Sequence, residues 1–348
     1  MPILLTRANY FRVHSLQTRR KVRILENPSH RNDDVELHFL QKQMMACLND
    51  DAFERGLKIA LKAIDHFPEK PTLTYSWVID FYMSLGKEKK AMEVLEQGFR
   101  RGAWWSPKYL RSELEELEDH PTFSRILKLG EERFNEVRQH TEAELIVRTP
   151  KEYSIERMYP LLLVLHGAFS SNFDSEPHWQ SVLDKRRLFL ASLQSSQVVS
   201  GNHCVWDDQD MALGDVEAAY SVLAERYPID ASKVILGGIS HGAEIALIAI
   251  FSNRVPARGF ISVIPSVGAF VQQFVKSNSL QNHRKRGLKG CIVAGERDPR
   301  YGNTKAIYEF LSKKGVSIQF YSYPELSHSV PDDLDQKLDK SVRFILDE

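Results

Sequence analysis

The segment that most constrains the fold of this chain is Gly238-Ile-Ser-His-Gly242, which directly follows the apolar, β-branched run 234–236. Residues 243–251 then have the composition of a helix. A Gly-x-Ser-x-Gly sequence between a strand and a helix forms a sharp turn that exposes the serine hydroxyl. The serine takes strained backbone angles in that turn, so its neighbours must be small, and the two glycines meet that need. An ordinary strand-to-helix loop is the alternative, but the context favours Ser240 as a nucleophile.

A serine hydroxyl becomes a good nucleophile only when an imidazole takes its proton and a carboxylate orients that imidazole. Two later segments supply these groups in the expected chain order of serine, acid, histidine. The apolar run 290–295 is followed by Asp298, and the alternating run 317–323 is followed by His328. Asp298 is therefore the predicted acid and His328 the predicted base, with Glu296 as the alternative acid.

Residues from about 142 to 348 resemble the α/β-hydrolase superfamily, most of all its esterase branch of carboxylesterases, acyl-protein thioesterases and dienelactone-hydrolase-like enzymes. Four segments carry the resemblance: 161–168, 238–242, 295–298 and 326–328. It implies an α/β-hydrolase fold with Ser240 as nucleophile, Asp298 as orienting acid and His328 as general base. Two departures leave the acyl preference open. His241 stands where many relatives have Gln, and the run after residue 167 is less rich in glycine.

Acyl transfer also needs two preset backbone N–H groups that stabilise the negative charge on the carbonyl oxygen. One is expected from His241, at the start of the helix that follows the nucleophile. By resemblance the other comes from Ala168, with Phe169 as the alternative donor. The side chain of His166 is a candidate second base, but a role in shaping this loop is favoured. The side chain of His241 is a weaker candidate for a role than its amide.

Several side chains around these loops leave two interpretations open. Four aromatic residues could equally line an acyl or alcohol pocket or be buried in the core: Phe169, Trp179, Trp206 and Phe270. His166 is a further candidate for the pocket. The acidic run 207–210 is compatible with a metal or a cationic ligand. Capping of the helix that begins near residue 212 is favoured, because Asp is stabilising at a helix N-terminus.

The order of elements after residue 142 predicts an α/β fold. Runs typical of strands occupy 144–149, 159–165, 188–193, 234–236, 259–264, 290–294 and 317–323, and runs typical of helices occupy 214–227, 243–251, 304–314 and 332–346. Strands that alternate with helices imply a mostly parallel sheet with helices on both faces. Active sites of such sheets lie at the carboxyl ends of the strands, where Ser240, Asp298 and His328 are all expected.

Residues 33–141 predict an all-α domain that precedes the sheet. Helices are expected at about 51–67, 74–85, 89–99, 107–117 and 122–140. Small or apolar residues recur about 35 residues apart, near the 34-residue period of tetratricopeptide repeats. These are Gly56, Ala60 and Ala63, then Ala91, Leu95 and Gly98. A surface for a protein partner is one interpretation. Packing on the hydrolase, or homodimer formation, is favoured.

The first 32 residues form a basic N-terminal extension in this interpretation. No acidic residue precedes Glu26, whereas six basic residues do: Arg7, Arg12, Arg19, Arg20, Lys21 and Arg23. That asymmetry resembles an organellar transit peptide. A β-rich or loosely ordered extension, or an over-extended start site, is the favoured alternative.

The amino-acid composition narrows the classes of protein and the partners that remain compatible with the sequence. Lys and Arg number 46, as do Asp and Glu, so overall charge does not indicate a nucleic acid or an anionic membrane as partner. Cys47, Cys204 and Cys291 are odd in number and far apart, which argues against a disulfide framework or a Cys-rich zinc site and favours a reducing compartment. No run of about 18 apolar residues predicts a transmembrane helix. A cytoplasmic protein is expected.

The sequence therefore predicts an enzyme, a serine hydrolase that cleaves small carboxylic esters or thioesters through an acyl-enzyme. This chemistry needs no metal or organic cofactor. A peptidase of the prolyl-oligopeptidase type is an alternative, but its extra domain is usually a β-rich propeller. A tetratricopeptide-like adaptor with a silent hydrolase domain is a third hypothesis. It requires a missing triad member, and all three are present in the sequence.

Overall fold

The computed structural model describes residues 20–28, 32–277 and 287–348. Its main feature is an eight-stranded sheet in the order β1-β2-β4-β3-β7-β8-β9-β10. Only β2 and β4 pair antiparallel in this sheet, and the other neighbours are parallel. The strands span Val22–Glu26 (β1), Ala143–Arg148 (β2), Tyr159–Leu165 (β3), Phe189–Gln194 (β4), Ile229–Ile239 (β7), Gly259–Val263 (β8), Lys289–Gly295 (β9) and Ser317–Tyr323 (β10). The predicted α/β-hydrolase fold with a mostly parallel sheet is confirmed.

Helices cover both faces of the sheet, as the apolar strands require. Successive side chains of a strand point to opposite faces, so a continuous apolar run such as β3 must be buried on both sides. Leu161 and Leu163 pack with residues of α9, α10 and α12, whereas Leu162 and Val164 pack with residues of α8 and α13. These helices span Gln180–Arg186 (α8), Gln209–Arg226 (α9), His241–Phe251 (α10), Tyr301–Lys313 (α12) and Leu334–Leu346 (α13).

The residues between β1 and β2 are mainly helical, and we call α1 to α6 the helical part. Its helices span Asn32–Asn49 (α1), Phe53–His66 (α2), Pro71–Ser84 (α3), Glu88–Arg100 (α4), Pro107–Glu113 (α5) and Phe123–Val137 (α6). From α1 to α4 each helix packs on the next. Small residues permit this close packing, since a Cβ on Gly56 would lie 2.1 Å from the Phe81 ring. The likeness to tetratricopeptide repeats stays a prediction.

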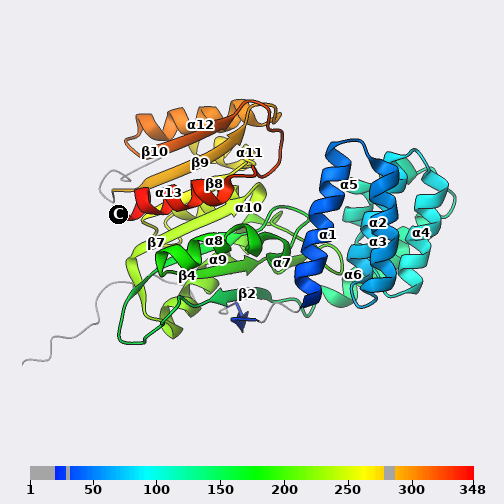
Figure 1. Ribbon diagram of the computed structural model, residues 1–348, viewed down its shortest axis with the longest axis horizontal. Helices are drawn as coiled ribbons and strands as arrows, with labels where there is room; N and C mark the ends of the chain where they lie inside the picture. Colours follow the sequence, from blue (N-terminus) through cyan, green and yellow to red (C-terminus); the bar gives the residue numbers. More distant parts are fainter. Residues whose placement is uncertain (1–19, 29–31, 278–286) are drawn as a thin grey trace, which may run out of the picture.

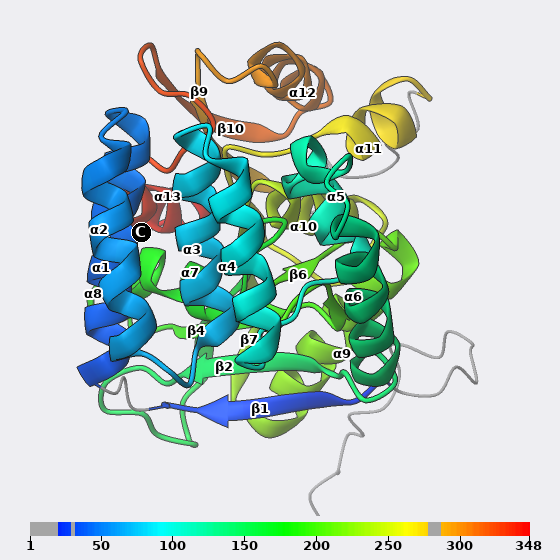
Figure 2. The same cartoon turned by 90° about the vertical axis from the view of Figure 1, so that its right-hand side faces the viewer.

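Figure 1 shows the helical part, coloured blue to cyan, at the end of the sheet toward which β4 and β7 point. Figure 2, turned by 90°, shows α3, α4 and α5 in front of the sheet and α10. The backbone N–H of Ser106 in the helical part donates to Val199 O at 2.7 Å, shortly after β4. The helical part therefore lies over the edge of the sheet at which the predicted catalytic residues stand.

Part of the predicted N-terminal extension belongs to the sheet. Residues 22–26 form β1, which pairs in parallel with β2 at the sheet edge. Arg20 adds an ion pair to buried Asp215 of α9 at 3.0 Å. Residues 1–19, which hold three of the six basic residues of the suggested transit peptide, lie outside the described residues. Among the helices described, none is both long and apolar enough to cross a membrane.

Candidate active site

Ser240 occupies a sharp turn between β7 and α10. Its backbone angles, φ 53° and ψ −118°, are ones that residues other than glycine rarely adopt. A Cβ on Gly238 would lie 2.5 Å from the Gly242 carbonyl carbon, and a Cβ on Gly242 would lie 2.2 Å from His166 O. Both flanking positions therefore need glycine. The turn is anchored by the Ser240 N–H, which donates to Val263 O at 2.9 Å.

Three side chains from three different loops meet at this turn. Ser240 Oγ lies 2.8 Å from His328 Nε2, and His328 Nδ1 lies 2.5 Å from Asp298 Oδ2. The loops follow β7, β10 and β9. The structure thus brings together the three residues predicted as nucleophile, base and acid. Glu296, the alternative acid, is exposed and instead accepts a hydrogen bond from Ser322.

The loops that carry the acid and the base pack directly on each other. A Cβ on Gly295 would lie 2.3 Å from Leu326 O, so only glycine permits this approach. Arg297 N donates to the same Leu326 carbonyl at 3.0 Å. The second carboxylate oxygen of Asp298 accepts from Arg300 N at 2.9 Å. These contacts hold the loop of Asp298 and one of its carboxylate oxygens in place, and the other oxygen contacts the imidazole of His328.

This geometry sets the tautomer of His328. An ionised carboxylate only accepts hydrogen bonds, so the bond to Asp298 requires the ring proton on Nδ1. Nε2 is then left with its lone pair facing Ser240. That is the arrangement in which an imidazole takes a proton from a serine hydroxyl.

The N–H groups of Ala168 and His241 have no hydrogen-bond acceptor among the described residues, and the same is true of the N–H of Phe169, the alternative donor. His241 is the first residue of α10, where the helix dipole favours negative charge. The loop 166–170, which we call the oxyanion loop, passes close to the nucleophile. A Cβ on Gly167 would lie 3.7 Å from the Cβ of Ser240.

His166 is buried and uses both ring nitrogens within the fold. Nδ1 lies 2.6 Å from Gly167 O, and Nε2 accepts from Ser195 N at 3.2 Å. Burial lowers the pKa of His166 to about 4. Its carbonyl accepts from Trp206 Nε1 at 2.9 Å. These contacts support the interpretation that His166 shapes the oxyanion loop, since no ring nitrogen is left for a proton transfer.

The aromatic residues considered for the pocket fall into two groups. Trp179, Trp206 and Phe270 are at most 1% exposed and pack in the core on the two faces of the sheet. Core packing, the other interpretation left open by the sequence, describes their position. Phe169 is half-buried in the oxyanion loop, where its ring meets Tyr109 of α5.

Two of the three aspartates in the acidic run 207–210 make contacts within the fold. Asp208 is the N-cap of α9 and accepts from Met211 N at 2.9 Å. Asp207 pairs with Lys108 of α5. No cluster of potential metal ligands occurs in the part of the chain that the structure describes. Capping, the favoured interpretation of this run, is what the structure shows for Asp208.

Sequence reasoning missed two residues next to the nucleophile. Ser266 Oγ lies 3.4 Å from Ser240 Oγ. Glu244, buried on α10, accepts from Phe270 N at 3.0 Å and so fixes the loop that carries Ser266. Burial raises the pKa of Glu244. The single carboxylate in the otherwise apolar run 243–251 was the available signal for this residue. No sequence signal pointed to Ser266.

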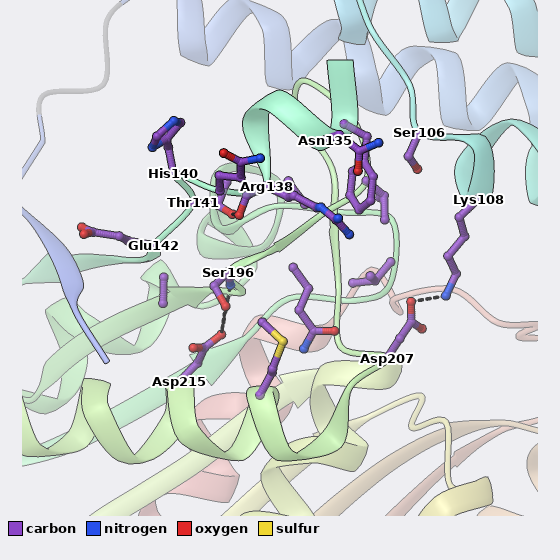
Figure 3. Close-up of a pocket in the computed structure, with 18 of the residues that line it drawn as sticks. Ser106, Lys108, Asn135, Arg138, His140, Thr141, Glu142, Ser196, Asp207 and Asp215 are labelled. Atoms are coloured by element: carbon purple, nitrogen blue, oxygen red, sulfur yellow. Dashed lines mark hydrogen bonds and ion pairs between the residues drawn. The ribbon is translucent and has the colours of Figure 1, made fainter. Parts of the chain in front are cut away.

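A separate cavity of about 1140 Å³ lies between the helical part and α9 (Figure 3). Lys108 and Arg138 line it from the helical part, and Asp207 and Asp215 line it from the other side. Neither Ser240 nor its two partners are among the lining residues. This cavity is therefore distinct from the site at the carboxyl ends of the strands.

Comparisons with known proteins agree with the fold. Residues 211–346 match the model of the phospholipase/carboxylesterase family. Among solved structures, an uncharacterised protein from Bacillus cereus ATCC 10987 is 24% identical with a TM-score of 0.50, covering 88% of this chain and 98% of its own. That coverage is more than the sheet and its helices alone could supply, so the neighbour shares part of the helical arrangement.

Two further solved structures are esterases. A bacterial heroin esterase is 18% identical with a TM-score of 0.47 and covers 59% of this chain and 80% of its own. A Bacillus cereus carboxylesterase is 16% identical with a TM-score of 0.44 and covers 62% of this chain and 98% of its own. No curated protein matches the sequence. The match to the family model spans residues 211–346, which include β7 to β10, and the eight-stranded, mostly parallel sheet has the fold of the α/β-hydrolases.

Proposed function

We propose that the chain is a serine esterase that cleaves carboxylic esters or thioesters of small molecules. Ser240 is the nucleophile, His328 the general base and Asp298 the acid that orients the imidazole. The observation that carries this proposal is the unbroken chain of contacts from Ser240 Oγ to His328 Nε2 (2.8 Å) and from His328 Nδ1 to Asp298 Oδ2 (2.5 Å).

In the first half of the reaction, Ser240 Oγ attacks the carbonyl carbon of the ester while its proton moves to His328 Nε2. Asp298 stabilises the imidazolium that forms. The carbonyl oxygen becomes an oxyanion, and the amides of Ala168 and His241 donate to it. When the tetrahedral intermediate collapses, the bond to the leaving oxygen or sulfur breaks. His328 returns its proton to the leaving group, and an acyl-serine remains.

In the second half, a water molecule replaces the leaving group. His328 Nε2 takes a proton from the water as its oxygen attacks the acyl carbon. The second tetrahedral intermediate then expels Ser240 Oγ, which recovers the proton from His328. The products are a carboxylic acid and the free enzyme. Every proton transfer passes through His328 Nε2, so these residues need no cofactor for the reaction.

The oxyanion donors contribute a large share of the expected rate. Loss of one such donor typically costs about 10²- to 10³-fold in kcat. Because both donors are backbone amides, their placement depends on the conformation of the surrounding loops. The Ser240 turn places the His241 amide, and the oxyanion loop places the Ala168 amide.

Labelling with a fluorophosphonate probe tests the assigned nucleophile. Wild type is expected to label, whereas Ser240→Ala is expected to lose labelling and His328→Ala to label far more slowly. Ser232→Ala is a matched control, because Ser232 is exposed on the same strand, away from the turn. Labelling that persists in Ser240→Ala rejects the assignment.

Substrate assays test the reaction class. A series of p-nitrophenyl esters of increasing acyl length, with thioesters of the same acyl groups, is expected to show hydrolysis that depends on Ser240. The acyl length at which kcat/KM falls measures the depth of the acyl pocket. An active-site serine that labels, but hydrolyses neither series, contradicts the esterase proposal.

A further inference from the structure

Residues 104–109 are a short segment that joins the helical part to the active-site loops. Ser106 N donates to Val199 O at 2.7 Å, and Gly201 N donates to Trp104 O at 3.2 Å. Both partners belong to the hairpin formed by β5, Gln197–Val198, and β6, Cys204–Val205. The segment is therefore fixed to this hairpin by its backbone.

The hairpin is in turn fixed to the oxyanion loop. Cys204 N donates to Ser170 O at 2.8 Å, and Ser170 N donates back to Cys204 O at 3.4 Å. A continuous set of backbone contacts thus runs from the helical part to the residue that follows Phe169.

Tyr109 adds a direct side-chain contact to this chain of backbone contacts. It stands in the first turn of α5, where its N–H donates to the N-cap Ser106 Oγ at 3.2 Å, and it is only 8% exposed. One face of its ring lies parallel to His203 of the hairpin, with centroids 5.5 Å apart. It also meets Phe169 of the oxyanion loop, with centroids 5.6 Å apart and ring planes at 79°.

Phe169 has a conformation that needs such support. Its φ of 51° lies in the left-handed region, which a bulky aromatic residue rarely adopts. Strained residues of this kind persist only where the surroundings hold them. The Ala168 N–H belongs to the peptide unit between Gly167 and Ala168, which meets the Ala168–Phe169 peptide unit at the Ala168 Cα. A change in the backbone angles of Phe169 would therefore move the Ala168–Phe169 peptide unit and, through the Ala168 Cα, the adjoining unit that carries the proposed donor.

We propose that Tyr109 is a positioning residue of the reaction. Its ring holds Phe169, and through Phe169 it holds the Ala168 N–H in the direction that receives the oxyanion. The inference rests on the proposed esterase function and deepens it, because it makes the helical part a component of the active site. Tyr109 acts through Phe169 and need not touch the substrate.

The test compares kcat and KM for p-nitrophenyl acetate in the full-length chain. Tyr109→Leu is expected to lower kcat about tenfold, a fraction of what complete loss of an oxyanion donor costs, with KM within about twofold of wild type. Affinity for an aryl trifluoromethyl ketone, which forms a tetrahedral oxyanion adduct on a serine, is expected to fall by the same factor as kcat. Tyr109→Phe keeps the ring and is expected to retain wild-type kcat.

A matched control separates positioning from general stability. Tyr75 of α3 is buried in the same hydrophobic cluster and, among the described residues, makes no ring contact with the oxyanion loop. Tyr75→Leu is expected to lower the melting temperature as Tyr109→Leu does, but to leave kcat near wild type. If Tyr109→Leu does not fold, Tyr109→Met keeps most of the buried volume without a flat ring, and the same loss of kcat is expected.

The outcomes are distinguishable. A kcat loss in Tyr109→Leu, or in Tyr109→Met where it replaces that variant, no larger than in Tyr75→Leu, or an effect confined to KM, overturns the inference while leaving the esterase proposal intact. A wild-type chain that neither labels at Ser240 nor hydrolyses esters overturns the proposed function itself.

Discussion

His328 Nδ1 lies 2.5 Å from Oδ2 of Asp298, a carboxylate that is only 6% exposed. The contact fixes the imidazole with Nε2 toward Ser240, so the orientation of the base depends on the acid. An amide in place of the carboxylate can donate to Nδ1 and would then stabilise the opposite tautomer.

Asp298→Asn is therefore expected to reduce kcat for an ester substrate on the order of 10³- to 10⁴-fold with little change in fold. Steady-state kinetics and thermal unfolding measure the two effects. Glu296→Gln is the matched control, because that carboxylate is exposed and bonds to Ser322 instead of the imidazole. Equal losses in the two variants would contradict the assignment of the acid.

Gly242→Ala tests the geometry of the nucleophile turn. The added methyl would lie 2.2 Å from His166 O and 2.6 Å from Leu165 O, both backbone atoms. Overpacking of this kind costs about 1–3 kcal/mol or more of unfolding free energy, and the turn must shift to relieve it. We expect a lower melting temperature and loss of fluorophosphonate labelling. Gly302→Ala on α12, where a Cβ meets nothing within 4 Å, should lower neither the melting temperature nor the labelling.

The sequence predicted the residues of the site because each lies at a recognisable strand end. Ser240 was marked by its glycines, and Asp298 and His328 by their order and by the strands before them. The predicted bounds of β3 and β10 coincide with those of the structure. The strands and the turns that follow them are local features, so patterns of apolar and small residues within short segments predict them.

Contacts between distant segments had no such signature. The packing of Tyr109 on Phe169 joins residues 60 positions apart, with α6, β2 and β3 between them, and no local sequence pattern reveals such a contact. The pocket and the core draw on the same aromatic residues, so Trp179 and Trp206 could not be assigned before the structure placed them in the core. A β-rich extension was one favoured interpretation of the N-terminal residues, but their sequence indicated no bounds for β1 and no sign that it pairs with β2 at the sheet edge.

Acid sensitivity is expected from His166. Its pKa is about 4 in the folded chain against an ordinary 6.5, because burial disfavours the charged ring. As pH falls, the His166 ring is protonated at a higher pH in the unfolded chain than in the folded chain. The stability contributed by the neutral ring is complete above pH 6.5 and is lost as pH falls from 6.5 to about 4. The loss amounts to roughly 3 kcal/mol at about 1.4 kcal/mol per pKa unit.

Urea unfolding at about pH 7.5 and about pH 4.5 measures this contribution. His166→Gln is expected to be less stable than wild type at the higher pH, and the difference should shrink at the lower pH. His140→Gln, at an exposed imidazole, is the control and should follow the wild-type pH dependence. A His166→Gln difference that is the same at both pH values would contradict the expectation.

Glu244 is expected to hold in place the loop that packs against the nucleophile Ser240. Its buried carboxylate accepts from Phe270 N at 3.0 Å, and the loop it fixes places Ser266 Oγ 3.4 Å from Ser240 Oγ. Ile264 in the same loop has φ 41°, a strained value for a β-branched residue. A glutamine at position 244 offers one acceptor in place of two and turns an N–H group toward backbone donors.

We therefore expect Glu244→Gln to cost about 1–3 kcal/mol of unfolding free energy, the penalty of a buried polar group left unpaired, and to lower kcat several-fold. Hydrogen exchange of the amides in residues 264–270 should become faster. Glu217→Gln, at an exposed carboxylate that pairs with Arg254, is the control and should change stability by less than about 1 kcal/mol. Unchanged exchange together with wild-type kcat in Glu244→Gln would show that the loop holds its position without this carboxylate.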